Sequence, residues 1–487
     1  MSAGNGARAI LKIAVLAALG RLLTPAEFGV VAAAGVAVWL SLIFSSLGVG
    51  PALIQRSSVD AEHVEAAAAA SALFGIATSL IVVALAPAVE SLLRVAGLAP
   101  ILRGLAVVFP LAGLASVAEC MLQRELRFGE LARAELTSYA IGYGLVGVGL
   151  GFAGAGAWAL VGAEIAKTAV KTVILLRAVP EARRLRIHLG PLKDLLHFGS
   201  GYTVSALSSY AAAQGDNVVV ARFLGAAALG IYGRAYELML VPAQAIGTLL
   251  EKVLFPALSR VQEDPARLRL AYRRAMALVA LLVMPMSAAS IILAPELVNA
   301  LLGPGWTGAV APFQVLALAM YFRVAYMIGH AVANATGAVR AVARRSAAFA
   351  ALVVTGALVG VRWGLVGVSI GVLGAMSVNF AIVMQLGARV TGLGARSIIG
   401  LHLPAAALTL IVGAEAWGAA TALRSIGAPS LVTLGAAALL ILPSLVLVIR
   451  ALPIVLGEDG RWLTELLCRS VPGPFAPMLR RTLLRTP

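Results

Sequence analysis

Charged side chains are scarce in this sequence. Asp, Glu, Lys and Arg together make up only 12% of the 487 residues, whereas hydrophobic residues make up 61%. A soluble globular domain is about a quarter charged and less than half apolar. The shortage of charge therefore excludes a water-soluble chain with one core, because lipid must be the solvent for most of this apolar surface.

The residues that several common chemistries require are also missing. The two cysteines, Cys120 and Cys468, lie in unrelated segments and no CxxC occurs, which argues against a disulfide framework or a zinc site. The chain has no Gly-Lys-Ser/Thr of a Walker A loop and no HExxH, and its five histidines are dispersed. We therefore expect no metal, no cofactor and no enzyme activity.

Acidic residues are the scarcer of the two charged classes. Lys and Arg number 38 against 22 Asp and Glu, a formal net charge of +16. The basic residues lie in short segments between apolar runs, so we expect no nucleic-acid partner. One alternate set of segments, with the C-terminal tail, holds 25 Lys and Arg, and the opposite set holds six. The positive-inside rule then predicts that both termini face the cytoplasm.

Apolar runs of about 20 residues, the length that crosses a bilayer, recur throughout the chain. Their number predicts an all-α integral membrane protein with about 14 transmembrane helices. The predicted spans are 8–23, 28–54, 64–94, 99–122, 136–152, 155–178, 196–222, 228–256, 272–302, 309–335, 341–361, 363–388, 398–422 and 429–452.

The chain also repeats itself. The segment from Arg21 to Gly29 (RLLTPAEFG) ends the first span, and the segment from Arg222 to Gly230 (RFLGAAALG) ends the seventh with the same spacing. Because six is even, both copies enter the membrane from the same side, which predicts parallel repeats related by a pseudo-two-fold axis along the membrane normal. The predicted domains are six-helix lobes at 1–195 and 196–397, two further helices at 398–452, and a basic cytoplasmic tail at 453–487.

Charges inside the apolar runs are the best functional signal, because a charge at the bilayer centre costs at least about 2.5–3.5 kcal/mol. Glu164 and Lys167 are three residues apart, as are Arg234 and Glu237. For each pair, mutual neutralisation and a role in a cavity both remain open. Two interpretations also remain open for the residues toward helix ends, whose side chains either reach the lipid headgroups or line a cavity. These residues are Lys12, Lys171 and Arg222.

Asp216 and Arg323 have no opposite charge within one helical turn, which favours function for both. Glu415 lies outside the repeated core, and we interpret it as structural. A basic cavity would attract an anion such as a pyrophosphate-bearing lipid. A lone acid such as Asp216 would instead bind H⁺ or Na⁺, with Asn217 and Glu237 as further candidates for ion coupling.

Several short motifs, in order and with matching spacing, are similar to one known family. Arg21–Gly29 followed by Ala52–Arg56 (ALIQR) resembles the opening of the Wzx-type polysaccharide flippases of the MOP exporter superfamily. A further set of segments looks like the second lobe of that family, and the whole resemblance spans about residues 15–390. These segments are Gly215–Asn217 (GDN), Leu229–Ala235 (LGIYGRA), Phe255–Arg260 (FPALSR), Ala294–Val298 (APELV) and Leu302–Trp306 (LGPGW).

This resemblance implies transport. The family carries undecaprenyl-diphosphate-linked oligosaccharide repeat units from the cytoplasmic to the periplasmic leaflet by alternating access, and basic residues line its cavity. Hinge or gate roles compete with substrate contact for Arg21, Arg56, Arg222 and Arg260, which sit near helix ends, and we assign Arg260 to a gate. The candidates for substrate binding are Lys12, Arg21, Arg56, Lys167, Lys171, Arg222, Arg234 and Arg323.

Two other functions remain as alternatives. A multidrug or toxin exporter of the same superfamily tends to show unpaired acids, whereas this core is mainly basic. An integral membrane polysaccharide polymerase would carry a sizeable periplasmic loop, which this chain lacks. The expected location is the bacterial cytoplasmic (inner) membrane. The expected partners are the lipid-linked oligosaccharide and membrane lipids, with a polymerase and a chain-length regulator as further candidates.

Overall fold

A computed structural model describes residues 2–46, 49–56, 58–186, 188–260, 264–335 and 339–451, and these ranges are helical apart from short connections. The earlier helices are α1 (Ser2–Leu22), α2 (Pro25–Ser46), α3 (Val49–Gln55), α4 (Ala61–Leu93), α5 (Leu98–Leu105), α6 (Val108–Arg124), α7 (Phe128–Tyr139), the π-helix η1 (Ala140–Gly147), α8 (Val148–Phe152), α9 (Ala157–Ala178) and the short η2 (Pro180–Arg183). The later ones are α10 (Leu189–Arg260), α11 (Pro265–Ile292), α12 (Ala294–Leu302), η3 (Pro304–Ala309), α13 (Val310–Ala335), α14 (Val339–Gly360), η4 (Val361–Trp363), α15 (Gly364–Thr391), α16 (Ala395–Ser425) and α17 (Ser430–Ala451).

The predicted fold class is confirmed, because helix covers all fourteen predicted spans within the described ranges. Length and hydropathy alone mark eight of the described stretches as able to cross a membrane. Two of the eight, Ala213–Gln244 and Ala347–Arg389, each take in parts of two predicted spans. Helix α9 is not among them, and its 22 residues carry Glu164, Lys167, Lys171 and Arg177. It is therefore a charged helix among apolar ones.

The chain divides into two compact units. Unit 1 comprises Met1–Gly233, Leu301–Trp306 and Ser346–Val368, and unit 2 comprises Arg234–Ala300, Thr307–Arg345 and Ser369–Pro487. The predicted domain boundaries near 195, 397 and 452 stay a prediction. The predicted tail at 453–487 lies outside the described residues.

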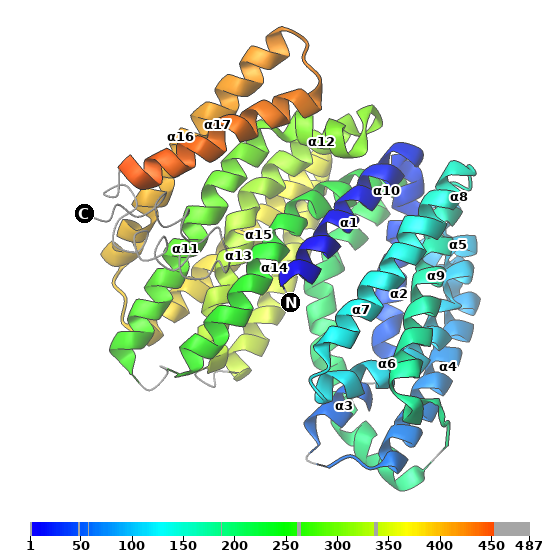
Figure 1. Cartoon of the computed structure of the whole chain (residues 1–487). Helices are drawn as coiled ribbons and strands as arrows, with labels where there is room; N and C mark the ends of the chain where they lie inside the picture. The colour runs from blue at the N-terminus through cyan, green and yellow to red at the C-terminus, as the bar shows by residue number, and fades with distance from the viewer. Residues whose placement is uncertain are drawn as a thin grey trace. The chain divides into compact units, whose positions relative to one another are not determined.

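In unit 1, helices α4, α6 and α9 pack side by side (Figure 1). Their shared core contains Leu53, Val64, Leu122 and Leu175, together with alanines of α4. Alanine has almost no side chain to order, and it lets neighbouring helices approach closely where lipid gives no hydrophobic force between them. The small residues of α4 thus explain why this apolar helix packs tightly against α6.

The turn between α1 and α2 is fixed by a capping box. The backbone N–H of Thr24 donates to Glu27 Oε2 at 2.7 Å, and the N–H of Glu27 donates to Thr24 Oγ1 at 3.4 Å. These bonds satisfy donors that a helix start leaves unpaired. The repeated segment uses different chemistry, because Gly225 interrupts α10 with a φ of 86°, a backbone conformation that favours glycine.

The two repeated segments meet each other inside unit 1. A Cβ atom on Gly29 would overlap the carbonyl oxygen of Ala226, and a Cβ atom on Gly230 would overlap that of Pro25. Gly29 corresponds to Gly230 in the sequence repeat, and Pro25 corresponds to Ala226. The contact is therefore reciprocal, and only a hydrogen atom fits at either glycine. Close backbone approach of this kind is typical of small residues in membrane helix pairs.

Trp306 is the largest side chain buried beside this contact. It is 2% exposed, its Nε1–H donates to the carbonyl oxygen of Gly20 at 2.7 Å, and its ring meets the edge of Phe28 at 5.3 Å between centroids. Leu302 lies against Gly20 as well. The Leu301–Trp306 segment is thereby held to the end of α1, which is why it belongs to unit 1.

Removing the indole N–H should destabilise the protein measurably. Trp306→Phe leaves the buried carbonyl of Gly20 unpaired and should lower the free energy of unfolding by about 1–3 kcal/mol, and Trp306→Ala by about 3–5 kcal/mol. Thermal unfolding of the purified protein in detergent measures this. Trp363→Phe is the matched control, because Trp363 is 69% exposed in the same unit. An equal fall in melting temperature for both phenylalanine variants would contradict the assignment.

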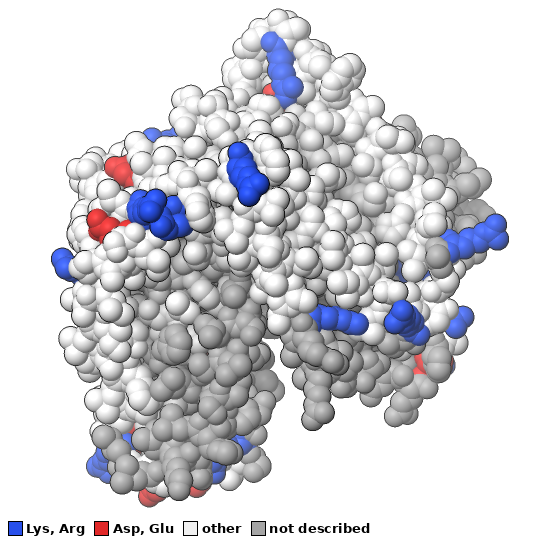
Figure 2. Space-filling view, turned by 180° about the vertical axis from the view of Figure 1, so that it is seen from behind, with Lys and Arg blue, Asp and Glu red and all other residues white. Residues whose placement is uncertain are grey.

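In unit 2, helix α11 packs against α13 and α16, and α17 packs against α16 (Figure 1). Tyr321 of α13 is hydrogen-bonded to His402 of α16, and both belong to a cluster of rings with Phe322 and Phe380. The described surface on the face shown in Figure 2 is mostly uncharged, with its charged side chains in small separate groups. A largely uncharged exterior of this kind suits a lipid surrounding.

Candidate functional site

Unit 2 contains a guanidinium without a carboxylate partner. Arg323 of α13 donates from Nη1 to the hydroxyl of Tyr326 at 2.9 Å, and its guanidinium lies 5.4 Å from the centre of that ring. The hydroxyl of Tyr236, on α10, is a second hydrogen-bond partner. The Nε atom of Arg323 is buried and makes no hydrogen bond. No ion pair forms between Arg323 and any described side chain. The guanidinium thus keeps a positive charge that no described carboxylate compensates, and such a charge favours an anionic ligand.

Arg234 and Glu237 form an ion pair with each other. Arg234 Nη1 lies 2.5 Å from Glu237 Oε2, and the two side chains are 23% and 39% exposed. The spacing of three residues on α10 brings them to one face of the helix, as it does in any α-helix. The structure thus shows neutralisation within the pair, and a role toward substrate or ions stays a prediction for both residues.

Asp216 is buried in unit 1 without a cation. It is 3% exposed, its Oδ2 accepts from the hydroxyl of Tyr232 at 2.6 Å, and its Oδ1 accepts from the backbone N–H of Asn217 at 2.9 Å. The side-chain amide of Asn217 donates instead to Gln214 at 2.7 Å. Among the described residues no Lys or Arg reaches Asp216. A carboxylate in this setting is costly to keep ionised, which is the property that a proton-binding group requires.

Lys167 and Lys171 of α9 lie among carboxylates. Lys167 Nζ is 3.0 Å from Glu164, and Lys171 Nζ is 2.9 Å from Glu119 and 3.5 Å from Glu135. All five side chains are between 22% and 34% exposed. Three acids thus surround two lysines, so this part of unit 1 is acidic rather than basic. The two lysines are poorly suited to attract an anion on their own.

A π-helix supplies a further contact to these carboxylates. Helix η1 carries Tyr143, whose hydroxyl donates to Glu164 Oε2 at 2.9 Å, and whose ring lies 5.9 Å from Lys167 Nζ. Single π-turns inside helices occur frequently at functional sites. Glu119, Glu135 and Tyr143 were not among the predicted residues, because contacts between different helices leave no spacing signal in the sequence.

The remaining predicted residues lie apart from these groups. Lys12 is half-buried in α1, and Arg21 is exposed at its end. The backbone carbonyl of Arg56 accepts a 2.6 Å hydrogen bond from the side chain of Arg124. Arg260 ends α10, and its side chain lies outside the described residues, so its gate role is a prediction only.

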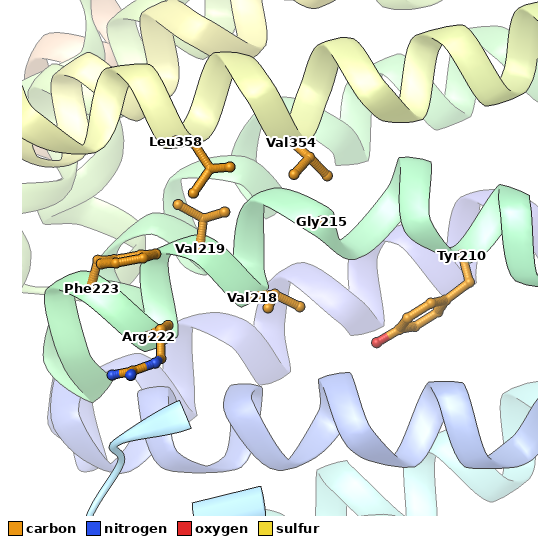
Figure 3. A pocket seen from close by; sticks show the side chains of 8 residues that line it. All are labelled: Tyr210, Gly215, Val218, Val219, Arg222, Phe223, Val354 and Leu358. Atoms are coloured by element: carbon orange, nitrogen blue, oxygen red, sulfur yellow. The ribbon is translucent and has the colours of Figure 1, made fainter. Parts of the chain in front are cut away.

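Arg222 borders a pocket of about 380 Å³ in unit 1. One wall is a face of α10 from Tyr210 to Phe223, and the other consists of Val354 and Leu358 of α14 (Figure 3). Figure 3 shows Val354 and Leu358 pointing toward α10, with Arg222 and Phe223 together at one end. The lining is apolar except for Arg222 and Tyr210.

Comparison with known proteins adds a family to this geometry. Residues 18–311 match a family model described as polysaccharide biosynthesis protein. Over 308 residues the chain is 23% identical to the lipopolysaccharide biosynthesis protein WzxC of Escherichia coli (strain K12), an alignment that covers 63% of this chain and 62% of that protein. Over 308 residues it is 26% identical to the succinoglycan biosynthesis transport protein ExoT of Rhizobium meliloti (strain 1021), with the same coverages. The aligned region spans less than two thirds of these relatives.

Among solved structures, the chain is similar to the lipid II flippase MurJ in an inward closed conformation. The TM-score is 0.73, and the match covers 91% of this chain and 96% of that one. The sequences are only 11% identical, so this similarity concerns the fold alone. The agreement over nearly the whole length extends the shared architecture beyond residue 311, where the family match ends.

Proposed function

The chain belongs to the family of polysaccharide biosynthesis proteins, and from this premise we propose that it flips lipid-linked oligosaccharides. The substrate is an undecaprenyl-diphosphate-linked repeat unit, which moves from the cytoplasmic to the periplasmic leaflet by alternating access. The product would supply the synthesis of a surface polysaccharide or exopolysaccharide. Relatives named for lipopolysaccharide biosynthesis and for succinoglycan transport support this choice of substrate class.

The observation that carries the proposal is the environment of Arg323. A half-buried arginine that is held by tyrosine hydroxyls, with no described carboxylate near it, presents positive charge to a ligand. Diphosphate is a natural match, because a guanidinium binds phosphate oxygens with two parallel hydrogen bonds. Arg323 is therefore the first choice for contact with the diphosphate. Lys167 and Lys171 rank below it, because carboxylates already neutralise them.

Ion coupling forms a second part of the proposal. Asp216 would take up H⁺ or Na⁺ as transport proceeds, since it is buried and, among the described residues, its hydrogen-bond donors are neutral. The proposed orientation places both termini in the cytoplasm, with a polymerase and a chain-length regulator as partners downstream. The basic residues on one set of connecting segments support that orientation.

Deleting the gene tests the proposed function directly. Lipid-linked repeat units should accumulate in the cytoplasmic leaflet, and surface polysaccharide should be lost, because the flipping step is missing. Extraction of the lipid-linked pool and staining of surface polysaccharide measure the two effects, and restoring the gene should reverse both. Normal export without accumulation would rule out the flippase function.

A further inference from the structure

The pocket between α10 and α14 has an apolar body with a positive charge at one end. Val218, Val354 and Leu358 line its body, and Arg222 lies at the end where Phe223 is 58% exposed. Along the lining α10 lies close to α14, because a Cβ atom on Gly215 would lie 2.5 Å from the Val354 side chain. A ligand for this pocket must be amphiphilic, with one apolar chain.

Arg222 has no carboxylate partner among the described residues. Its guanidinium lies 5.9 Å from the centre of the Phe223 ring, and among the described side chains no carboxylate forms an ion pair with it. The only other polar group in the lining, the hydroxyl of Tyr210, already donates to the carbonyl oxygen of Val36 at 2.5 Å. The free charge of the pocket is therefore positive, which selects an anionic headgroup.

The pocket is oriented as a lipid is within one leaflet, with its charged end toward the membrane surface and its apolar body toward the middle. Gly225 breaks α10 three residues after Arg222, so Arg222 sits in the last turn before the helix break. From there the lining runs back to Tyr210, about 18 Å along the helix axis at 1.5 Å per residue, within a hydrocarbon core of about 30 Å. A headgroup at Arg222 would thus lie toward the membrane surface, and its chain would extend toward the middle.

We propose that this pocket binds an anionic phospholipid, with the phosphate at Arg222 and an acyl chain between α10 and α14. The exposed fractions of Val218 and Leu358, 36% and 42%, leave room for a chain to contact both helices. Asp216 follows Gly215 directly on α10, so the lipid would pack against the helix that carries the proposed coupling residue. The site does not depend on the proposed transport function.

Native mass spectrometry of the full-length protein, purified in detergent, tests this site with phosphatidylglycerol as the probe. Phosphatidylglycerol should bind more tightly than zwitterionic phosphatidylethanolamine. Arg222→Gln should weaken phosphatidylglycerol binding about tenfold, the loss of roughly one charge-assisted hydrogen bond, and Arg222→Lys should restore most of it. Val218→Trp, which fills the pocket, should weaken the binding of both lipids.

Two substitutions serve as matched controls. Arg362→Gln removes an exposed arginine one turn beyond Leu358, and Val359→Trp enlarges a residue that is 60% exposed beside the pocket. Both should bind phosphatidylglycerol as the unaltered protein does. The proposal is wrong if Arg222→Gln binds normally or if Arg362→Gln loses as much. Binding of undecaprenyl phosphate without phosphatidylglycerol would also overturn it, in favour of the chain of the transported lipid. None of these outcomes depends on export, so they are independent of the gene-deletion experiment.

Discussion

Export should fall by about 10- to 150-fold when Arg323 is replaced by glutamine. The lost interaction is a hydrogen bond from a charged donor to phosphate, worth about 1.5–3 kcal/mol, and each 1.4 kcal/mol corresponds to a factor of ten. Folding should be spared, because Arg323 has only neutral partners and no carboxylate loses its counter-charge among the described residues. Surface polysaccharide and the lipid-linked pool, measured in a deletion strain that carries the variant, report the effect.

Two further variants separate substrate contact from structure. Arg323→Lys should recover part of the export, because it keeps the charge but loses the paired donors of the guanidinium. Arg396→Gln removes an exposed arginine at the start of α16 in the same unit and should export normally. Normal export by Arg323→Gln, at an unchanged protein level in the membrane, would show that Arg323 does not face the substrate.

Replacing Asp216 with asparagine should cost at least about fivefold in export, the lower end of typical coupling free energies of 1–3 kcal/mol between two sites. Asparagine has the same shape and still accepts a hydrogen bond from Tyr232, but it cannot take up a proton. The melting temperature should stay the same or rise, since a buried carboxylate without a cation costs free energy. Export measured with and without a proton or sodium gradient would reveal the lost coupling.

The matched control for Asp216 is Glu415→Gln. Glu415 is also an acid inside a helix, and its Oε2 accepts from the hydroxyl of Ser444 at 2.7 Å, a contact that holds α16 to α17. This substitution should leave the ion dependence of export unchanged. If Asp216→Asn exports normally and retains its gradient dependence, Asp216 is a structural residue that is satisfied by Tyr232.

The helices of this protein could be predicted from the sequence because their cause is local. A run of about 20 apolar residues must form a helix in lipid, where every backbone group needs an internal partner. The same reasoning predicted one continuous helix for the ninth span, at 272–302. There the helix stops at Ile292, and Ala294–Leu302 forms the separate helix α12. The break falls at Leu293, whose side chain is as apolar as its neighbours, so hydropathy gives no signal.

In the candidate site, contacts within one helix could be predicted from the sequence, whereas contacts between helices could not. The pairs Glu164–Lys167 and Arg234–Glu237 were visible as possible partners, because three residues make almost one helical turn. The partners of Lys171 could not be predicted, because Glu119 and Glu135 reach it from two other helices, α6 and α7. Asp216 has a similar explanation. The sequence showed an acid without a local cation, but only the fold brings Tyr232 from the far side of the Gly225 break to its carboxylate.

The reciprocal contact between Gly29 and Ala226, and between Gly230 and Pro25, has the form of the interface in a symmetric dimer. In a true dimer of identical chains, every substitution would occur twice, once in each half of the interface. Here the two halves belong to one gene and can change separately. The turns before the two glycines already differ. One half has a Thr24–Glu27 capping box, and the other half has Gly225. One half can therefore acquire a new role while its counterpart keeps the halves together.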